Sequence, residues 1–177
     1  MEMTITIILQ LVTIAASLFS IIITVVVSKL ENQKTHYLEI VTKQRMKNKE
    51  EVQRAAQAII KNSHPQMLDS ITDEQIKECI DAEAIIATIF KSIYEKEAEL
   101  IDCINDLIAE LKKHKTTKEN FENVVSARDL FILKFSIYDQ ADWIFIKNQA
   151  RGENKEFKDY DSIYLKVNEE FEQSQKK

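Results

Sequence analysis

The chain has 177 residues and a formal net charge of −5, and it contains one glycine and one proline. Because turns depend on these two residues, so low a content excludes a loop-rich fold and indicates an all-α chain. The single glycine also excludes a glycine-rich phosphate loop, and the excess of acidic residues argues against generic nucleic-acid binding.

The first element is an apolar stretch, residues 3–28, which contains no charged residue, no proline and no glycine. At about 1.5 Å per residue, a helix of this length crosses a hydrocarbon core of about 30 Å. The sequence therefore predicts one transmembrane helix over residues 1–29, followed by a cytosolic helical bundle.

Polar side chains recur along this stretch at steps of three or four residues. On a helix that turns about 100° per residue, they fall within an arc of roughly 80°. Small hydroxylated residues at this spacing let helices pack closely and hydrogen-bond, which favours self-association, but the same face could line a water-filled pore. Both interpretations stay open for this polar stripe, which consists of Thr6, Gln10, Thr13, Ser17, Ser20, Thr24 and Ser28.

The flanks of the stretch set its orientation. Glu2 precedes it without any Lys or Arg, whereas several basic residues follow it, and basic flanks remain in the cytoplasm. We therefore expect a single pass through the inner membrane, with the N-terminus outside and the C-terminal part cytoplasmic. Residues 30–62 are predicted to form a basic juxtamembrane helix, which either only orients the chain or also attracts anionic lipids. The membrane-proximal basic residues are Lys29, Lys34, Lys43, Lys47 and Lys49.

Further along the chain, start and stop signals delimit a helical bundle over residues 72–174. Pro65 ends the juxtamembrane helix, since the residue before a proline is disfavoured in a helix. A Thr-x-x-Gln capping box at Thr72 opens the next helix. A Thr-x-x-Glu box at Thr116 is predicted to open an aromatic helix that reaches Arg151, and a short helix follows it.

No stretch resembles a catalytic or metal-binding motif. The sequence lacks a Gly-x-Ser-x-Gly elbow and a His-Glu-x-x-His pair. His36, His64 and His114 flank helices, where we expect them to be solvated. Cys79 and Cys103 lie in apolar helical stretches and are expected to be core residues. We therefore predict no enzymatic activity, no metal site and no cofactor.

Two short motifs resemble those of small single-pass helical membrane proteins found among bacterial anti-phage defence genes. Tyr-x-x-x-Val-Thr-x-x-Arg spans residues 37–45, and Asp-Trp-x-x-Ile-Lys spans residues 142–147. Such proteins usually carry a Trp three residues after the Arg, where this chain has Asn48. The resemblance implies a membrane protein of anti-phage defence.

The residues themselves suggest that the two motifs meet. Arg45 falls on the packing face of its helix, where a guanidinium needs a carboxylate or an aromatic ring as its partner. Asp142 and Trp143 offer one of each. We therefore predict that Arg45 contacts Asp142 or Trp143 and that this contact couples the bundle to the span.

These features lead us to expect a non-enzymatic, self-associating effector of prokaryotic immunity that perturbs or permeabilises the inner membrane. Its cytosolic domain would be triggered by a defence-system protein or by a small nucleotide signal. Two alternatives remain: a passive tether or scaffold for a separate defence enzyme, and a nucleotide sensor without a pore. The polar stripe separates effector from tether, because an inert anchor has no need of it.

Overall fold

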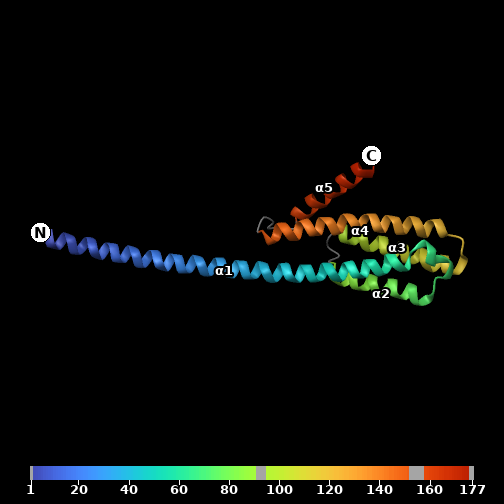
Figure 1. Ribbon diagram of the computed structural model, residues 1–177, viewed down its shortest axis with the longest axis horizontal. Helices are drawn as coiled ribbons and strands as arrows, with labels where there is room; N and C mark the ends of the chain where they lie inside the picture. Colours follow the sequence, from blue (N-terminus) through green and yellow to red (C-terminus); the bar gives the residue numbers. More distant parts are fainter. Residues whose placement is uncertain (1, 91–94, 152–157, 176–177) are drawn as a thin grey trace. The chain divides into compact units, whose positions relative to one another are not determined.

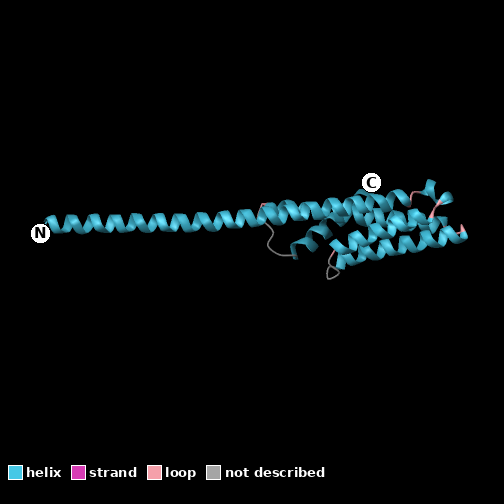
Figure 2. Ribbon diagram, turned by 90° about the horizontal axis from the view of Figure 1, so that it is seen from below, coloured by secondary structure: helices cyan, strands magenta, loops and turns pink. Residues whose placement is uncertain are grey.

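The computed structural model describes residues 2–90, 95–151 and 158–175, and for residues 2–16, 18, 33, 34, 158, 159 and 175 it describes the backbone alone. Every element in these ranges is a helix, and the described connections between helices are short loops, drawn pink in Figure 2. The all-α class is therefore confirmed for the described part of the chain. The elements are α1 (Glu2–Asn62), η1 (Pro65–Ser70), α2 (Asp73–Ile89), α3 (Glu95–Thr117), α4 (Phe121–Ala150) and α5 (Lys158–Gln175), and Figure 1 labels the five α-helices.

The apolar stretch of residues 3–28 lies within α1, whose helical backbone has no break at residue 29. Among the residues that the structure describes, no helix combines the length and the apolar character needed to cross a membrane. The side chains of residues 2–16 and 18, which belong to the expected span, lie outside the described side chains.

The chain divides into two compact units, Met1–Val41 and Thr42–Lys177, so α1 contributes residues to both. In the first unit, the described side chains between Ser17 and Asn32 are all exposed. They include Phe19 at 67% and Val25 at 60%. Taken by itself, this unit is a helical segment that presents large apolar side chains on its surface.

The second unit is a helical bundle with two groups of buried side chains. The larger group comes from α1, η1, α2, α3 and α4, and Ile59, Leu107 and Phe131 are fully buried in it. The smaller group joins α4 to α5 and includes Phe145 and Tyr160. α4 therefore packs against both α3 and α5, which explains why its apolar residues cover more than one face.

The structure confirms the predicted end of α1 before η1 and the predicted start of α2 after it. α1 ends at Asn62, and Pro65 begins η1, with His64 Nδ1 accepting a hydrogen bond from a backbone N–H of that helix at 3.3 Å. At α2, the Gln75 N–H donates to Thr72 Oγ1 at 3.2 Å, and the Thr72 N–H donates to Gln75 Oε1 at 2.8 Å. The first capping box is therefore confirmed.

The second predicted capping box is wrong. Thr116 and Thr117 are the last residues of α3, and their hydroxyls donate to carbonyls one turn back, each at 3.1 Å. The chain reverses at Lys118, whose φ of 60° is left-handed and whose N–H donates to the His114 carbonyl at 2.8 Å. α4 then begins at Phe121. The threonines thus complete the hydrogen bonding of one helix instead of opening the next.

Expectations for three other side chains had mixed outcomes. Cys79 and Cys103 are buried, as predicted, and burial raises the pKa of the Cys79 thiol to about 11. His114 is not solvated: it is 2% exposed, and its ring centroid lies 6.2 Å from that of Phe121. The apolar face of α3 therefore continues through the basic last turn that the sequence had marked as solvated.

Candidate functional site

Charged and polar side chains of the second unit converge where the C-terminal part of α1 faces α4. On α1 they recur every four residues and on α4 after three, so each set occupies one helix face. α1 residues of higher number meet α4 residues of lower number, so the two helices are antiparallel here. We call this group the ionic cluster: Arg45, Lys49, Gln53, Asp139 and Asp142.

Lys49 lies at the centre of the ionic cluster. Its ammonium group contacts the Asp139 carboxylate, donates to the Asp139 backbone carbonyl at 2.7 Å and lies 3.9 Å from Asp142 Oδ2. The Lys49 side chain is 9% exposed. Gln53 adds a hydrogen bond of 2.8 Å to Asp139 Oδ1. A buried ammonium is stable only with such partners, so these contacts fix how α1 and α4 pair.

The Asp142 carboxylate of this group is largely buried and has a raised pKa. Its side chain is 17% exposed, and burial raises its pKa from 3.8 to about 6. The charges of Lys49 and Arg45 lower this pKa, and Asp139 raises it, but burial is the largest effect. Asp142 therefore changes its charge near pH 6, within the range that cells reach.

Arg45 packs against the ring of Phe145, and its direct contact with Asp142 stays a prediction. The Arg45 guanidinium carbon lies 4.8 Å above the centroid of the Phe145 ring, and its charge acts on Asp142. Trp143 is 39% exposed and receives Lys147 Nζ 4.7 Å from its ring centroid instead. Residues three apart share a helix face while adjacent residues do not, so Asp142 and Phe145 face α1 together and Trp143 points elsewhere.

Aromatic rings enclose the α4 side of the ionic cluster. The Phe145 ring lies edge-on to Tyr160 with centroids 5.6 Å apart, and Tyr138 lies 6.2 Å from Tyr160. The Tyr160 hydroxyl is buried and has no hydrogen-bond partner among the described residues. Burial raises the pKa of both tyrosines, which keeps them neutral. Both hydroxyls lie close enough to Asp142 for its charge to raise their pKa further.

Sequence reasoning missed three members of this site: Lys49 as a buried group, Gln53 and Asp139. The sequence predicts that Lys49 lies on the membrane-proximal surface. In the structure, its side chain is largely buried against α4. The available signal was its position four residues after Arg45, which places both cations on one helix face. Of the other basic residues, Lys29, Lys43 and Lys47 are exposed, and Lys34 lies outside the described side chains.

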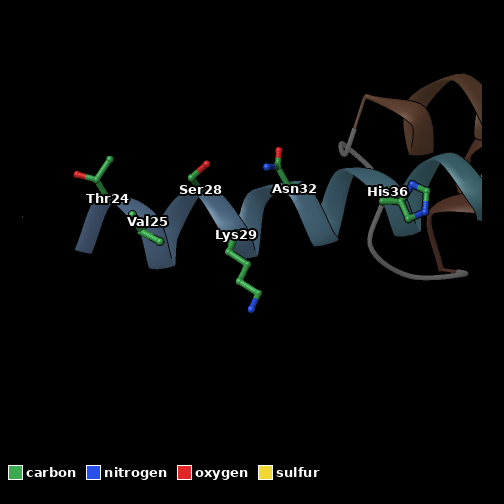
Figure 3. Close-up of a pocket in the computed structure, with 6 residues that line it drawn as sticks. All are labelled: Thr24, Val25, Ser28, Lys29, Asn32 and His36. Carbon is green, nitrogen blue, oxygen red and sulfur yellow. The ribbon is translucent and has the colours of Figure 1, made fainter. Parts of the chain in front are cut away.

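The described part of the polar stripe lies in the first unit. Figure 3 shows Thr24 and Ser28 pointing to the same side of α1, with Asn32 continuing the line and Lys29 pointing away. These residues belong to the lining of a shallow hollow of about 560 Å³. The Thr24 hydroxyl donates to the Ser20 carbonyl at 2.8 Å, the local bond by which a helix accommodates such groups.

The stripe is therefore continuous over its described members and extends one step further than predicted. Ser17, Ser20, Thr24 and Ser28 are exposed in this single chain. The side chains of Thr6, Gln10 and Thr13 lie outside the described side chains.

Chemically, the ionic cluster can hold helices in register and can change its charge with pH. No group of three or more potential metal ligands occurs among the described residues. Comparison of the chain with protein-family models, with curated proteins and with solved structures finds no match.

Proposed function

We propose that this protein is a non-enzymatic, membrane-anchored effector of prokaryotic anti-phage immunity that self-associates through the polar stripe of α1. When the bundle of the second unit is triggered, the assembled chains perturb or permeabilise the inner membrane. The observation that carries the proposal is the segregation of every polar residue between residues 5 and 28 onto one face of an uncharged helical stretch. An anchor alone needs apolarity but no such segregation.

The membrane location rests on the sequence of residues 3–28 and on the basic residues that follow them. In this proposal, the stretch spans the inner membrane once and leaves the bundle in the cytoplasm. The apolar side chains from Phe19 to Val27 that are exposed in the single chain are then covered by lipid or by other copies of the chain.

The ionic cluster supplies the proposed coupling. Arg45, Lys49 and Gln53 belong to the same helix as the polar stripe, while their partners belong to α4. A trigger that changes the packing of α4 alters the charge balance around Asp142 and Lys49. That change acts on α1, and thereby on the association of the stripes.

The membrane location is tested first. The full chain should remain in the membrane fraction after an alkaline carbonate wash, and placing Lys at both Ile14 and Ile22 should release it, since charges at mid-helix oppose insertion. Placing Lys at the exposed Gln57 and Asn105 of the second unit is the matched control and should not release it. Release of the unmodified chain by carbonate would overturn the membrane anchor.

The stripe is tested by replacing Gln10, Thr13, Ser17 and Ser20 together with Leu or Val. These changes raise apolarity, so insertion persists, but they remove the groups that hold a bundle together or wet a pore. We expect loss of depolarisation and of survival under phage challenge at matched membrane abundance. Conservative changes on the other side of the helix, Ile22→Leu, Val25→Leu and Val26→Leu, should leave both unchanged. A stripe variant that protects as well as the unmodified chain would favour the passive tether instead.

Self-association has an independent test. Single cysteines at Ser17 or Ser20 should crosslink chains in membranes, whereas cysteines at Ile22 or Val25 should not. The two native cysteines are buried and provide a low background. Equal crosslinking from both faces would mean that the stripe is not the interface.

A further inference from the structure

A groove of about 570 Å³ lies between α1 and α2 within the second unit. Its lining residues follow the same spacing on both helices, since residues 51, 54, 55 and 58 of α1 and residues 78, 81, 82 and 85 of α2 each rise by three, four and seven. That spacing defines one continuous face on each helix. The groove is therefore bounded by two matching helix faces, the arrangement into which a third helix packs in a bundle.

The floor of the groove is small and apolar. Ala55 and Ala82 are 5% and 4% exposed, and Ala58 is partly buried beside them. Ile85 borders the groove with 47% of its surface exposed. Alanines let another backbone approach closely, while an exposed Ile beside them offers apolar surface for burial. This floor suits a helix with small apolar residues on its contact face.

The rim of the groove is acidic. Glu51, Glu78 and Asp81 line it with one cation, Arg54, whose guanidinium lies 4.0 Å from Glu50, outside the lining. Glu51 lies 4.0 Å from Lys47 Nζ, and Glu78 accepts a hydrogen bond of 2.7 Å from Asn62, whereas Asp81 makes no hydrogen bond or ion pair with any described residue. A rim of this charge attracts cations and repels phosphates. The groove is thus unsuited to an anionic nucleotide.

We propose that the groove between α1 and α2 binds a cationic amphipathic helix of a partner protein. Small apolar residues of that helix lie on Ala55, Ala58 and Ala82, and its flanking Lys or Arg residues face Glu51 and Asp81. In the effector function proposed above, such a partner is the trigger. That role rests on the proposed function, whereas the binding does not.

The binding experiment uses the full chain purified in detergent and a labelled 16-residue probe peptide. The probe places Ala and Leu at helix positions rising by three and four, with Lys elsewhere. We expect saturable binding by fluorescence anisotropy that weakens as salt is raised, because rim charges contribute through long-range attraction. A peptide with Glu in place of every Lys should not bind. A Lys peptide of the same composition in scrambled order should bind at least about tenfold more weakly, because it lacks the apolar face.

Two pairs of substitutions then locate the site. Glu51→Lys with Asp81→Lys should weaken binding by at least about tenfold and remove its salt dependence. Asp102→Lys with Asp106→Lys makes the same change of charge on exposed positions of α3 and should change affinity less than about twofold. If the first pair fails to fold, Glu51→Gln with Asp81→Asn provides the same comparison with smaller changes.

Three results would overturn the proposal. Binding of the scrambled peptide as tightly as the probe would reduce the effect to general attraction between charges. Equal weakening by both pairs of substitutions would place the site elsewhere. Crosslinking between chains through a cysteine at Ile85, without any peptide, would show that a second copy occupies the groove. None of these depends on membrane insertion or on phage protection, so they do not bear on the effector proposal.

Discussion

At the scale of single residues, Lys49 holds the ionic cluster together. It lies near both carboxylates of the cluster, and its 9% exposure leaves little water to replace those contacts. A buried ion pair adds little net stability, but removal of one member leaves the other charge desolvated. The two acidic residues therefore depend on Lys49 more than Lys49 depends on either of them.

This asymmetry predicts opposite effects for two substitutions. Lys49→Met should destabilise the second unit by roughly 2 to 4 kcal/mol, because it strands two carboxylates. Asp142→Asn should be neutral or stabilising near pH 7, because it removes a desolvated charge while Lys49 keeps Asp139. Urea unfolding, followed through the single Trp143, measures both. Lys47→Met, at a side chain that is 68% exposed, is the control and should lie within about 0.5 kcal/mol of the unmodified chain. Similar losses for Lys47 and Lys49 would contradict the burial of Lys49.

The raised pKa of Asp142 predicts how stability depends on pH. Its pKa is 3.8 as a free side chain and about 6 in the folded unit, so the folded unit binds a proton more tightly than the unfolded chain. The contribution of Asp142 to stability is therefore fully present below about pH 4 and is lost as the pH rises through about 6. The loss amounts to roughly 2 to 3 kcal/mol. It is measured as the difference in unfolding free energy between the unmodified chain and Asp142→Asn at several pH values. A difference that does not change between pH 4 and 7 would contradict the shift.

At the scale of helices, one face of α1 packs against one face of α4, and the contacting residues on each helix are three or four positions apart. Arg45 and Phe145 form one end of this contact, and Gln53 and Asp139 form the other. Local signals predicted where the helices begin and end around Pro65 and Thr72, because caps depend on neighbouring residues alone. They failed at Thr116, since the left-handed turn at Lys118 depends on how α3 and α4 pack. Spacing within α1 places Lys49 on the same face as Arg45, but it does not show which face of α4 packs against that face.

The pairing of these two helix faces predicts which α4 residues are energetically coupled to Arg45. In double-mutant cycles with Arg45→Met, Phe145→Leu and Asp142→Asn should each show a coupling of about 0.5 to 2 kcal/mol. Trp143→Leu should show none, since Trp143 contacts Lys147. Additive effects at Phe145 and Asp142 would mean that Arg45 contacts neither residue.

At the scale of the whole molecule, the sequence predicts the helices of both units but not all the contacts within the second unit. The composition and the apolar periodicity sufficed to predict helices throughout the described chain and the core role of Cys79 and Cys103. The pairing of Lys49 and Gln53 with Asp139 and the α1–α2 groove could not be predicted, because each joins side chains that are distant in sequence. The proposals for the first unit rest mainly on its sequence. The described side chains of this unit show how the stripe continues from Thr24 to Asn32.

The smaller buried group between α4 and α5 has a consequence for amide hydrogen exchange. α5 is held by fewer buried residues than the rest of the bundle, and one of them, Tyr160, buries a hydroxyl that has no hydrogen-bond partner among the described residues. Such an element opens at a lower free energy than the global unfolding of its domain. Amides of α5 should therefore exchange faster than those of α3 around Leu107. Tyr160→Phe should slow the exchange of α5 alone, because it removes the unsatisfied hydroxyl and keeps the ring. Exchange at equal rates in both helices would show that the second unit opens only as a whole.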